Sequence, residues 1–186
     1  MSPDWPVETN RLTLRPFVEG DLDAVHAMRS DPEVVRYLYG EVQSRDETRT
    51  SLEQKIAAPA WVQEGDWLSA AAVERESGLI VGDMALHWVS ERGRTAEIGF
   101  VFDPRHQGKG FATEAAGALI DWVFMGAGFH RVIGRAEARN AASARVLEKL
   151  GMRLEAHFVE NEWVKGEWQS ELVYAILERE WRRQSP

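Results

Sequence analysis

Apolar and polar residues alternate in several short stretches of the chain, and this period of two predicts β-strands. Near the N-terminus, Leu12 and Leu14 alternate with charged and hydroxyl side chains in a strand that ends at Pro16. Turn signals at Gly78 and Gly166 predict two hairpins. The other predicted strands cover residues 67–73, 79–88, 96–102, 132–138, 153–164 and 167–177.

Elsewhere apolar residues recur every three or four positions, which predicts amphipathic helices. The clearest helix runs from about Gly108 to Met125. A later helix is capped by Asn140 and closed by Gly151, residue types that favour those two ends. Further helices are predicted over residues 21–29, after a cap at Asp31, over residues 44–58 and over residues 178–183.

Strands and helices mixed along the chain, with antiparallel hairpins at both ends, predict an α+β fold. We expect a mixed central sheet with helices on both faces. The chain has 186 residues and shows no repeat, linker or low-complexity stretch, so we expect one domain over residues 1–186. No stretch approaches the roughly 20 apolar residues of a membrane span, and the N-terminus does not resemble a signal peptide. These features predict a cytoplasmic protein without a membrane partner.

Charge is distributed unevenly along the chain. The net charge is −8, but residues 105–153 hold eight Lys or Arg and four Asp or Glu, a local balance of +4. This split fits an anionic cofactor on the basic segment and a cationic acceptor elsewhere, or it serves only solubility. An acidic chain with no other basic patch argues against nucleic acid. With no cysteine and no histidines at ligand spacing, we predict no metal, disulfide or cysteine acyl-enzyme.

Residues 103–114 join an apolar strand to the longest predicted helix. Gly108 and Gly110 stand where that helix begins, and glycine tolerates positive φ and close approach of another group. The first N–H groups of a helix have no internal partner and carry partial positive charge. With Arg105 and Lys109 nearby, the segment predicts a phosphate-binding loop. An ordinary strand-to-helix turn is the alternative, because neither GxGxxG nor GxxxxGK[ST] is present.

At these residues the sequence resembles the GNAT acetyltransferase superfamily. The pattern Arg105-x-x-Gly108-x-Gly110, after a strand that carries Glu97, is similar to the coenzyme A pyrophosphate loop of that family. The other matching segments are residues 140–152 and, for the RimJ/RimL-type branch, residues 9–16 and 166–176.

The resemblance implies an N-acetyltransferase that uses acetyl-CoA, with direct attack by a primary amine. The acceptor would be a protein N-terminal α-amine or a small-molecule amine. Two alternatives stay open, an aminoglycoside-type antibiotic N-acetyltransferase and a non-catalytic acyl-CoA-binding sensor. In the family, residues like 44–58 form one wall of the acceptor site, and homodimers are common. Ser170 stands where the RimJ/RimL-type branch often carries aspartate, which weakens the case for a peptide acceptor.

Glu97 and Ser143 are the candidate catalytic residues. Glu97 lies in an otherwise apolar strand, and a carboxylate beside an apolar cleft can act as a base. The alternative is a strand-end glutamate that faces water. Ser143 shares a helix face with Leu147 and Leu150 and points inward. Its hydroxyl either bonds the carbonyl four residues back or serves the leaving thiolate, a role that other family members give to tyrosine.

The family also implies where the cofactor binds. The pantetheine arm would bond to the strand segment 99–102, which splays from its neighbour; this implies a bulge that Gly99 would ease. Backbone N–H groups near Val101 would polarise the thioester carbonyl, and Asn140 would both cap its helix and contact the pantetheine. The expected cofactor-binding residues are Phe100, Val101, Phe102, Arg105, His106, Gln107, Gly108, Lys109, Gly110, Phe111, Ala112 and Asn140.

Tryptophan is frequent, with eight in the chain. An aromatic face attracts a cation, so some of these side chains are candidates for the lining of an acceptor pocket. Core packing is the commoner role for tryptophan. The candidates are Trp61, Trp67, Trp88, Trp163 and Trp168.

Overall fold

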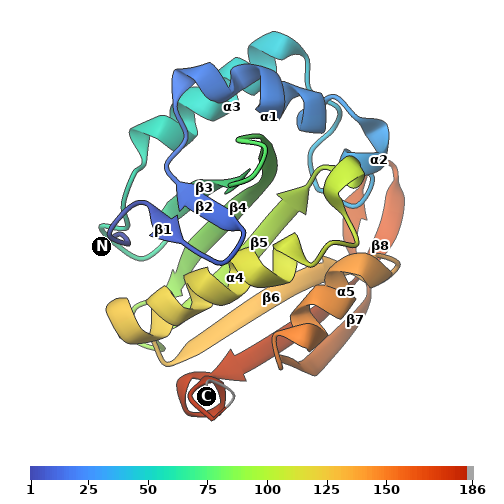
Figure 1. The fold of residues 1–186 in the computed structure, drawn as a ribbon. Coiled ribbons are helices and arrows are strands. Elements are labelled where there is room, and N and C mark those ends of the chain that lie inside the picture. Colours follow the sequence, from blue (N-terminus) through green and yellow to red (C-terminus); the bar gives the residue numbers. More distant parts are fainter. Residues whose placement is uncertain (184–186) are drawn as a thin grey trace.

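Eight strands form one mixed sheet in the computed structural model, which describes residues 1–183 (Figure 1). The spatial order is β1-β2-β3-β4-β5-β6-β8-β7, and every neighbouring pair is antiparallel except β5 and β6. The predicted α+β class is confirmed. The strands are β1 (Val7–Glu8), β2 (Leu12–Arg15), β3 (Trp67–Glu74), β4 (Ile80–Ser90), β5 (Thr95–Phe102), β6 (Arg131–Glu137), β7 (Arg153–Val164) and β8 (Glu167–Leu177).

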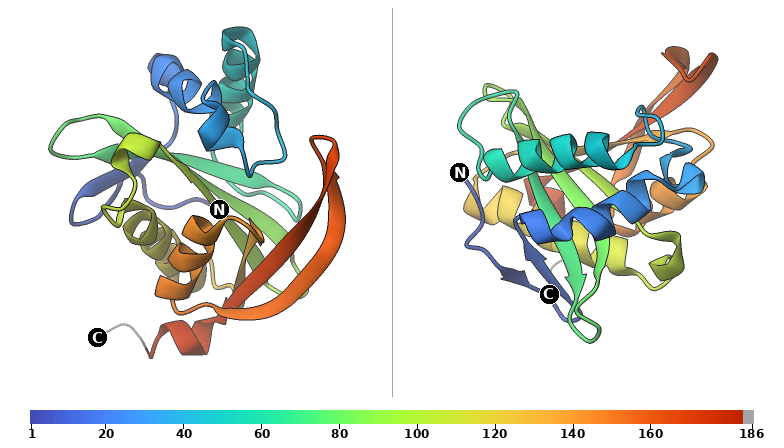
Figure 2. Two further views of the ribbon diagram at one scale, coloured as in Figure 1. Left: turned by 90° about the vertical axis from the view of Figure 1, so that its right-hand side faces the viewer. Right: turned by 90° about the horizontal axis from the view of Figure 1, so that it is seen from above.

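Helices cover both faces of the sheet, as predicted (Figures 1 and 2). On one face, α1 (Leu22–Arg29) and α3 (Arg45–Ala57) enclose a small apolar core. On the other, α4 (Phe111–Asp121) and α5 (Ala141–Lys149) cover the main core. The remaining helical segments are α2 (Pro32–Val35), α6 (Glu178–Trp181), two 3-10 turns (Glu19–Asp21 and Pro104–His106) and a π turn (Trp122–Gly126).

The main core depends on the apolar stripe of α4. Ala115, Ala116 and Leu119 are buried there against the sheet, because residues three and four apart share one helix face. Full burial of a side chain such as Leu119 stabilises the fold by about 1.5–3 kcal/mol. Trp61 is fully buried in the same core and packs against the ring of Trp88, with ring centroids 6.0 Å apart. Core packing, and not ligand binding, therefore explains these two tryptophans.

Most element boundaries follow the local signals in the sequence. The predicted caps at Asp31 and Asn140 are confirmed, and Ser44 caps the helix that was predicted to begin there. Each of these side chains accepts a backbone hydrogen bond at the start of a helix. The helix predicted from Gly108 begins later, at Phe111, because the positive φ of Gly110 is incompatible with a helical turn. The two-residue strand β1 was not predicted, since so short a segment shows no period.

The sheet opens into a fork between β5 and β6. The two strands pair only between residues 95–97 and 131–133. Beyond this point β6 continues along β8, and within the described residues 99–102 have β4 as their only strand partner. The predicted splay is confirmed, but the predicted bulge at Gly99 is wrong. The β4–β5 register is continuous there and shifts instead between Trp88 and Ser90.

The β7–β8 hairpin extends beyond the rest of the sheet (Figure 2, left). Most of β7 is exposed, including the apolar side chains of Phe158, Val159 and Trp163. Within residues 1–183, no helix has the length and apolar character needed to cross a bilayer. The fold thus leaves two features for function, the fork and the loop that follows β5.

Candidate active site

A cavity of about 380 Å³ lies at the fork, and we call it the acceptor cavity. Its walls come from α1, α3, the segment 37–40, the start of α5 and strands β3 to β8. Glu97, Ser143 and Asn140 all line it. The fold therefore brings together the two residues that were predicted as catalytic, from β5 and α5.

Glu97 is held inside this cavity by an ion pair. Its side chain is 20% exposed, and its Oε2 atom lies 3.3 Å from Nε of Arg135. Burial raises the pKa of Glu97; Arg135 opposes this shift, and the nearby carboxylate of Glu171 adds to it. Glu97 is thus not a strand-end glutamate that faces water. A carboxylate whose pKa is raised is a stronger base than an ordinary glutamate, which suits it to accept a proton.

Three residues next to Glu97 were not predicted. Nη1 of Arg135 lies 2.8 Å from Oε1 of Glu171, and the hydroxyl of Tyr39 donates to Oε2 of Glu171 at 3.1 Å. Burial, together with Glu171, raises the pKa of Tyr39 to about 12. One signal for Glu171 was available in the sequence. Gln169, Glu171 and Val173 lie two residues apart, so they share one face of β8, and this face is buried.

Ser143 lies in the first turn of α5. Its N–H donates to Oδ1 of Asn140 at 3.1 Å, which is the predicted cap. Leu147 and Leu150 are buried on the same helix face. Among residues 1–183 the Ser143 hydroxyl makes no hydrogen bond, so the back-bonded alternative does not hold. The hydroxyl is available to a bound molecule in the cavity.

A buried carboxylate, Asp83 on β4, anchors the helical wall of the cavity. It is 3% exposed and pairs with Nη2 of Arg29 at 2.7 Å and with Nζ of Lys55 at 2.8 Å. Removing one partner of a buried ion pair typically costs about 3–5 kcal/mol. This cluster therefore fixes α1 and α3 against the sheet. Lys55 belongs to the segment that was expected to form one wall of the acceptor site, and it lines the cavity.

The segment of residues 103–113, which we call the phosphate loop, follows β5 directly. Positive φ values of 76° at Gly108 and 83° at Gly110 turn the chain into α4. From residue 108 to residue 113, the backbone N–H groups donate no hydrogen bond to any part of the chain that the structure describes. A Cβ atom built on Gly108 would meet nothing within 4 Å. Free donors beside open space, at a helix N-terminus, suit a phosphate group.

Side chains hold the phosphate loop in shape. Asp103 accepts a hydrogen bond from the N–H of Arg105 at 2.9 Å and pairs with its guanidinium. The amide of Gln107 donates to the carbonyl of Phe102 at 3.2 Å. Arg11, which was not predicted, donates from Nη1 to the carbonyl of Lys109 at 2.9 Å. The conformation that exposes the N–H groups is thus fixed before anything binds.

The predicted cofactor-binding residues occupy different places. Phe100, Val101 and Asn140 line the acceptor cavity. The side chains of Phe102 and Phe111 are buried in the main core, so only their backbone groups are available. The remaining predicted residues, which lie on the phosphate loop, are Arg105, His106, Gln107, Gly108, Lys109, Gly110 and Ala112.

Of the five candidate tryptophans, only Trp67 lines the acceptor cavity. Its ring stacks on His87, with centroids 4.3 Å apart. Trp163 and Trp168 pack edge to face with each other near the end of the β7–β8 hairpin. One aromatic face is therefore available to a cationic acceptor at this wall.

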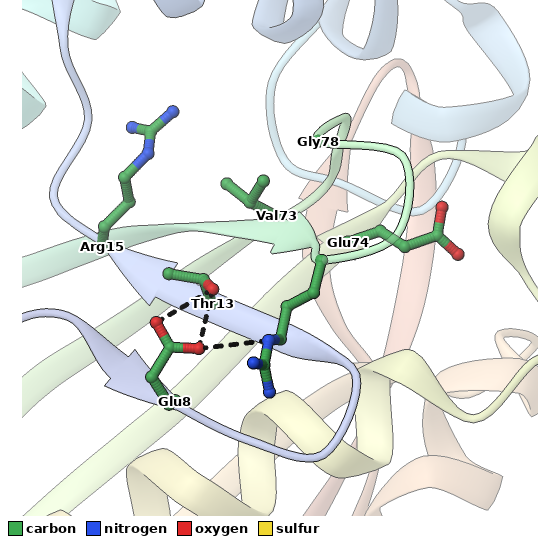
Figure 3. A pocket seen from close by; sticks show the side chains of 7 residues that line it. Glu8, Thr13, Arg15, Val73, Glu74 and Gly78 are labelled. Carbon is green, nitrogen blue, oxygen red and sulfur yellow. Dashed lines mark hydrogen bonds and ion pairs between the residues drawn. The ribbon is translucent and has the colours of Figure 1, made fainter.

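A second cavity, of about 340 Å³, lies at the edge formed by β1, β2 and β3 (Figure 3). There Glu8 accepts a hydrogen bond from the hydroxyl of Thr13 at 2.9 Å and pairs with Arg75 at 3.5 Å. Arg15 pairs with Asp21 and Glu74 accepts a hydrogen bond from Ser77, so the charged groups of this cavity are already engaged. None of the predicted site residues lines this cavity.

Comparison with known proteins adds independent findings. A family model described as an acetyltransferase (GNAT) domain matches residues 11–153. The uncharacterised N-acetyltransferase YnaD of Bacillus subtilis is 32% identical, over 94% of this chain and 98% of that protein. The spermidine N(1)-acetyltransferase of Vibrio cholerae is 25% identical, over 95% of this chain and 98% of its own length. The crystal structure of a GNAT-family acetyltransferase from Bacillus anthracis superposes with a TM-score of 0.85 at 33% identity, covering 94% and 99% of the two chains.

Proposed function

Because this chain belongs to the GNAT acetyltransferase family and is an acetyltransferase enzyme, we propose that it moves an acetyl group from acetyl-CoA to a primary amine in the acceptor cavity. One observation carries the proposal. Strand β5 places Glu97 at the fork, runs along residues 99–102 with β4 as its only strand partner among the described residues, and ends at the phosphate loop. A base, a free strand edge and a phosphate site thus follow one another along a single strand.

The chain's own groups fit acetyl-CoA. The free N–H groups of residues 108–113, with Arg105 and Lys109, would hold the pyrophosphate. The free edge of residues 99–102 and Asn140 would hold the pantetheine arm. When bound, acetyl-CoA supplies an acetyl group on a thioester, which an amine nitrogen can attack.

Glu97 and Ser143 would act on protons. A side-chain amine with a pKa near 10.4 is only about 0.04% neutral at pH 7, so it must lose a proton before it can attack. Glu97 would accept this proton, directly or through a water. The free hydroxyl of Ser143 would donate to the leaving sulfur. Both groups line the same cavity, as these roles require.

The charge of the cavity favours a cationic acceptor. Five carboxylates line it against three cationic side chains, and Trp67 adds an aromatic face. The Vibrio cholerae relative acts on spermidine by its name. We therefore favour a polyamine-like small molecule over a protein N-terminus, with aminoglycosides as a second polycationic class. The RimJ/RimL-type branch, the homodimer and the cytoplasmic location stay predictions.

A thiol-release assay with acetyl-CoA tests this function. The panel contains polyamines, aminoglycosides and peptides that begin with Ser or Thr. We expect the highest kcat/KM for a polyamine. A peptide as the best substrate would contradict the acceptor class. Calorimetric binding of acetyl-CoA without transfer to any amine would contradict the catalytic proposal and favour the sensor alternative.

A further inference from the structure

Arg135 stands at the fork and connects three strands. The last residue pair of the parallel β5–β6 pairing is Glu97 with Ile133. Arg135 lies on β6 two residues beyond Ile133. Its Nε atom is 3.3 Å from Glu97 on β5, and its Nη1 atom is 2.8 Å from Glu171 on β8. One guanidinium therefore spans the gap that opens between β5 and β6.

The groups around Glu97 make Arg135 its electrostatic partner. Tyr39 and Glu162 line the same cavity from the segment 37–40 and from β7. His87 is the cross-strand neighbour of Glu97 on β4, and burial lowers the pKa of its imidazole. Among residues 1–183, Arg135 is the one cation that pairs with Glu97.

Four further charged groups line the cavity, and each is already paired. Glu137 on β6 pairs with Arg139 at 2.8 Å. Arg29 on α1 and Lys55 on α3 both pair with Asp83 on β4. This cluster therefore adds no free cation for Glu97. Besides burial, which is the largest influence, the charge state of Glu97 depends on Arg135 and on Glu171.

We propose that Arg135 is a positioning residue for acetyl transfer: its guanidinium orients the Glu97 carboxylate and keeps it in the charged form that accepts a proton. The inference rests on the proposed role of Glu97 as the base. A half-buried carboxylate beside a second carboxylate is otherwise driven toward its neutral form, since burial and like charge both disfavour ionisation. A cation between the two carboxylates opposes both effects, and at 42% exposure it faces the cavity, not the core.

The same strand offers a matched control. Arg131 also lies on β6 and also pairs with a glutamate, Glu155, with Nη1 to Oε1 at 3.1 Å. That pair lies outside the acceptor cavity. Replacing Arg131 removes one cation and one ion pair from β6, and replacing Arg135 removes one cation and two ion pairs, but only the second replacement affects Glu97.

The first test measures the titration of Glu97 directly, by NMR of the full-length protein labelled with carbon-13 at glutamate carboxyls. The Glu97→Gln variant assigns the signal. In Arg135→Gln the pKa of Glu97 should rise, and in Arg135→Lys it should stay close to that of the wild type. In Arg131→Gln it should be unchanged. In Glu171→Gln it should fall, because a like charge is removed and Arg135 remains.

The opposite directions for Arg135→Gln and Glu171→Gln keep the proposal testable if one variant fails to fold. Equal titration of Glu97 in folded Arg135→Gln and Arg131→Gln would overturn it. So would a rise in Glu171→Gln.

The second test is the pH profile of kcat/KM for an accepted amine. In Arg135→Gln the acid limb of this profile should move to higher pH, and kcat/KM should partly recover at pH values above that limb. Arg135→Lys should restore most of the wild-type profile. A uniform loss at every pH would overturn the electrostatic role. If Glu97 titrates as expected but no amine is acetylated, the proposed function fails while the effect of Arg135 on Glu97 stands.

Discussion

The phosphate loop and the acceptor cavity are built in opposite ways. The phosphate loop is one continuous segment, and the groups that we propose to bind phosphate are backbone N–H donors that glycine turns expose. The acceptor cavity takes its polar side chains from strands, helices and a connecting segment that lie far apart in the sequence. We therefore expect backbone conformation to matter most for function in the loop, and the identity and pairing of side chains to matter most in the cavity. Substitutions that change backbone conformation should therefore affect the loop most, and substitutions that change a polar side chain should affect the cavity most.

The largest effect is expected in the cavity, for Glu97→Gln. The change keeps the shape and removes the base, so turnover of an amine with a pKa near 10.4 should fall by about 10²–10⁴-fold at pH 7. The rate should recover as pH rises and the amine loses its proton unaided. Because the pKa of Glu97 is raised, the wild type itself should lose activity on acidification at a higher pH than an ordinary glutamate would give.

Glu155→Gln is the matched control, since Glu155 also pairs with an arginine of β6 but lies outside the cavity. Coenzyme A affinity of Glu97→Gln, measured by calorimetry, should stay near that of the wild type. A wild-type rate in Glu97→Gln, with chemistry limiting, would remove Glu97 from the mechanism.

The next effect is expected in the loop, for Gly110→Val. At φ 83° a β-branched residue is strained, so the loop would relax, and binding would have to restore the strained backbone at a cost of about 1–3 kcal/mol. The valine side chain would also occupy part of the space proposed for the phosphate. Together these effects should lower coenzyme A affinity, measured by calorimetry, by about 100-fold. Gly78→Val, with φ 69° in the β3–β4 turn, should cost stability but no affinity. Equal affinity in both variants would make the loop purely structural.

A smaller effect is expected in the cavity for Ser143→Ala. Loss of a hydrogen bond to a charged sulfur should lower turnover by about tenfold. The loss should not reverse at high pH, unlike that of Glu97→Gln, and Ser143→Thr should keep much of the rate because it keeps a hydroxyl. Recovery of Ser143→Ala at high pH would assign the serine to the amine instead of the leaving group.

The smallest effect is expected for Arg105→Ala in the loop. Its guanidinium is exposed and already paired with Asp103, so its loss should weaken coenzyme A by about fivefold, or about 1 kcal/mol. Calorimetry in parallel with Gly110→Val provides the comparison. A loss as large as that of Gly110→Val would break the contrast between the two regions, because a side chain would then carry binding in the loop.

The difference between the regions also explains which parts of the site could be predicted. Asn140, Gly108 and Gly110 act within a few residues of their own position, so their caps and turns are visible in the sequence. Glu97 was visible because a charge interrupts an apolar strand. Arg135 was not, because it is an ordinary charged residue until strand pairing brings it to Glu97. The alternation along β8 marks Glu171 as buried, but it does not place Glu171 beside Glu97.

The sequence by itself determined the order of strands and helices, the α+β class, the phosphate loop and the residues of β5 that lead to it. These features depend on period, caps and turns, whose energies arise between close neighbours in the chain. The tertiary structure decided where β5 and β6 part, since β6 pairs over its full length with β8, which follows much later in the chain. It also decided which charges face the fork. Such pairings are set by the packing of the whole sheet, where a shift of one residue would turn Arg135 to the opposite face.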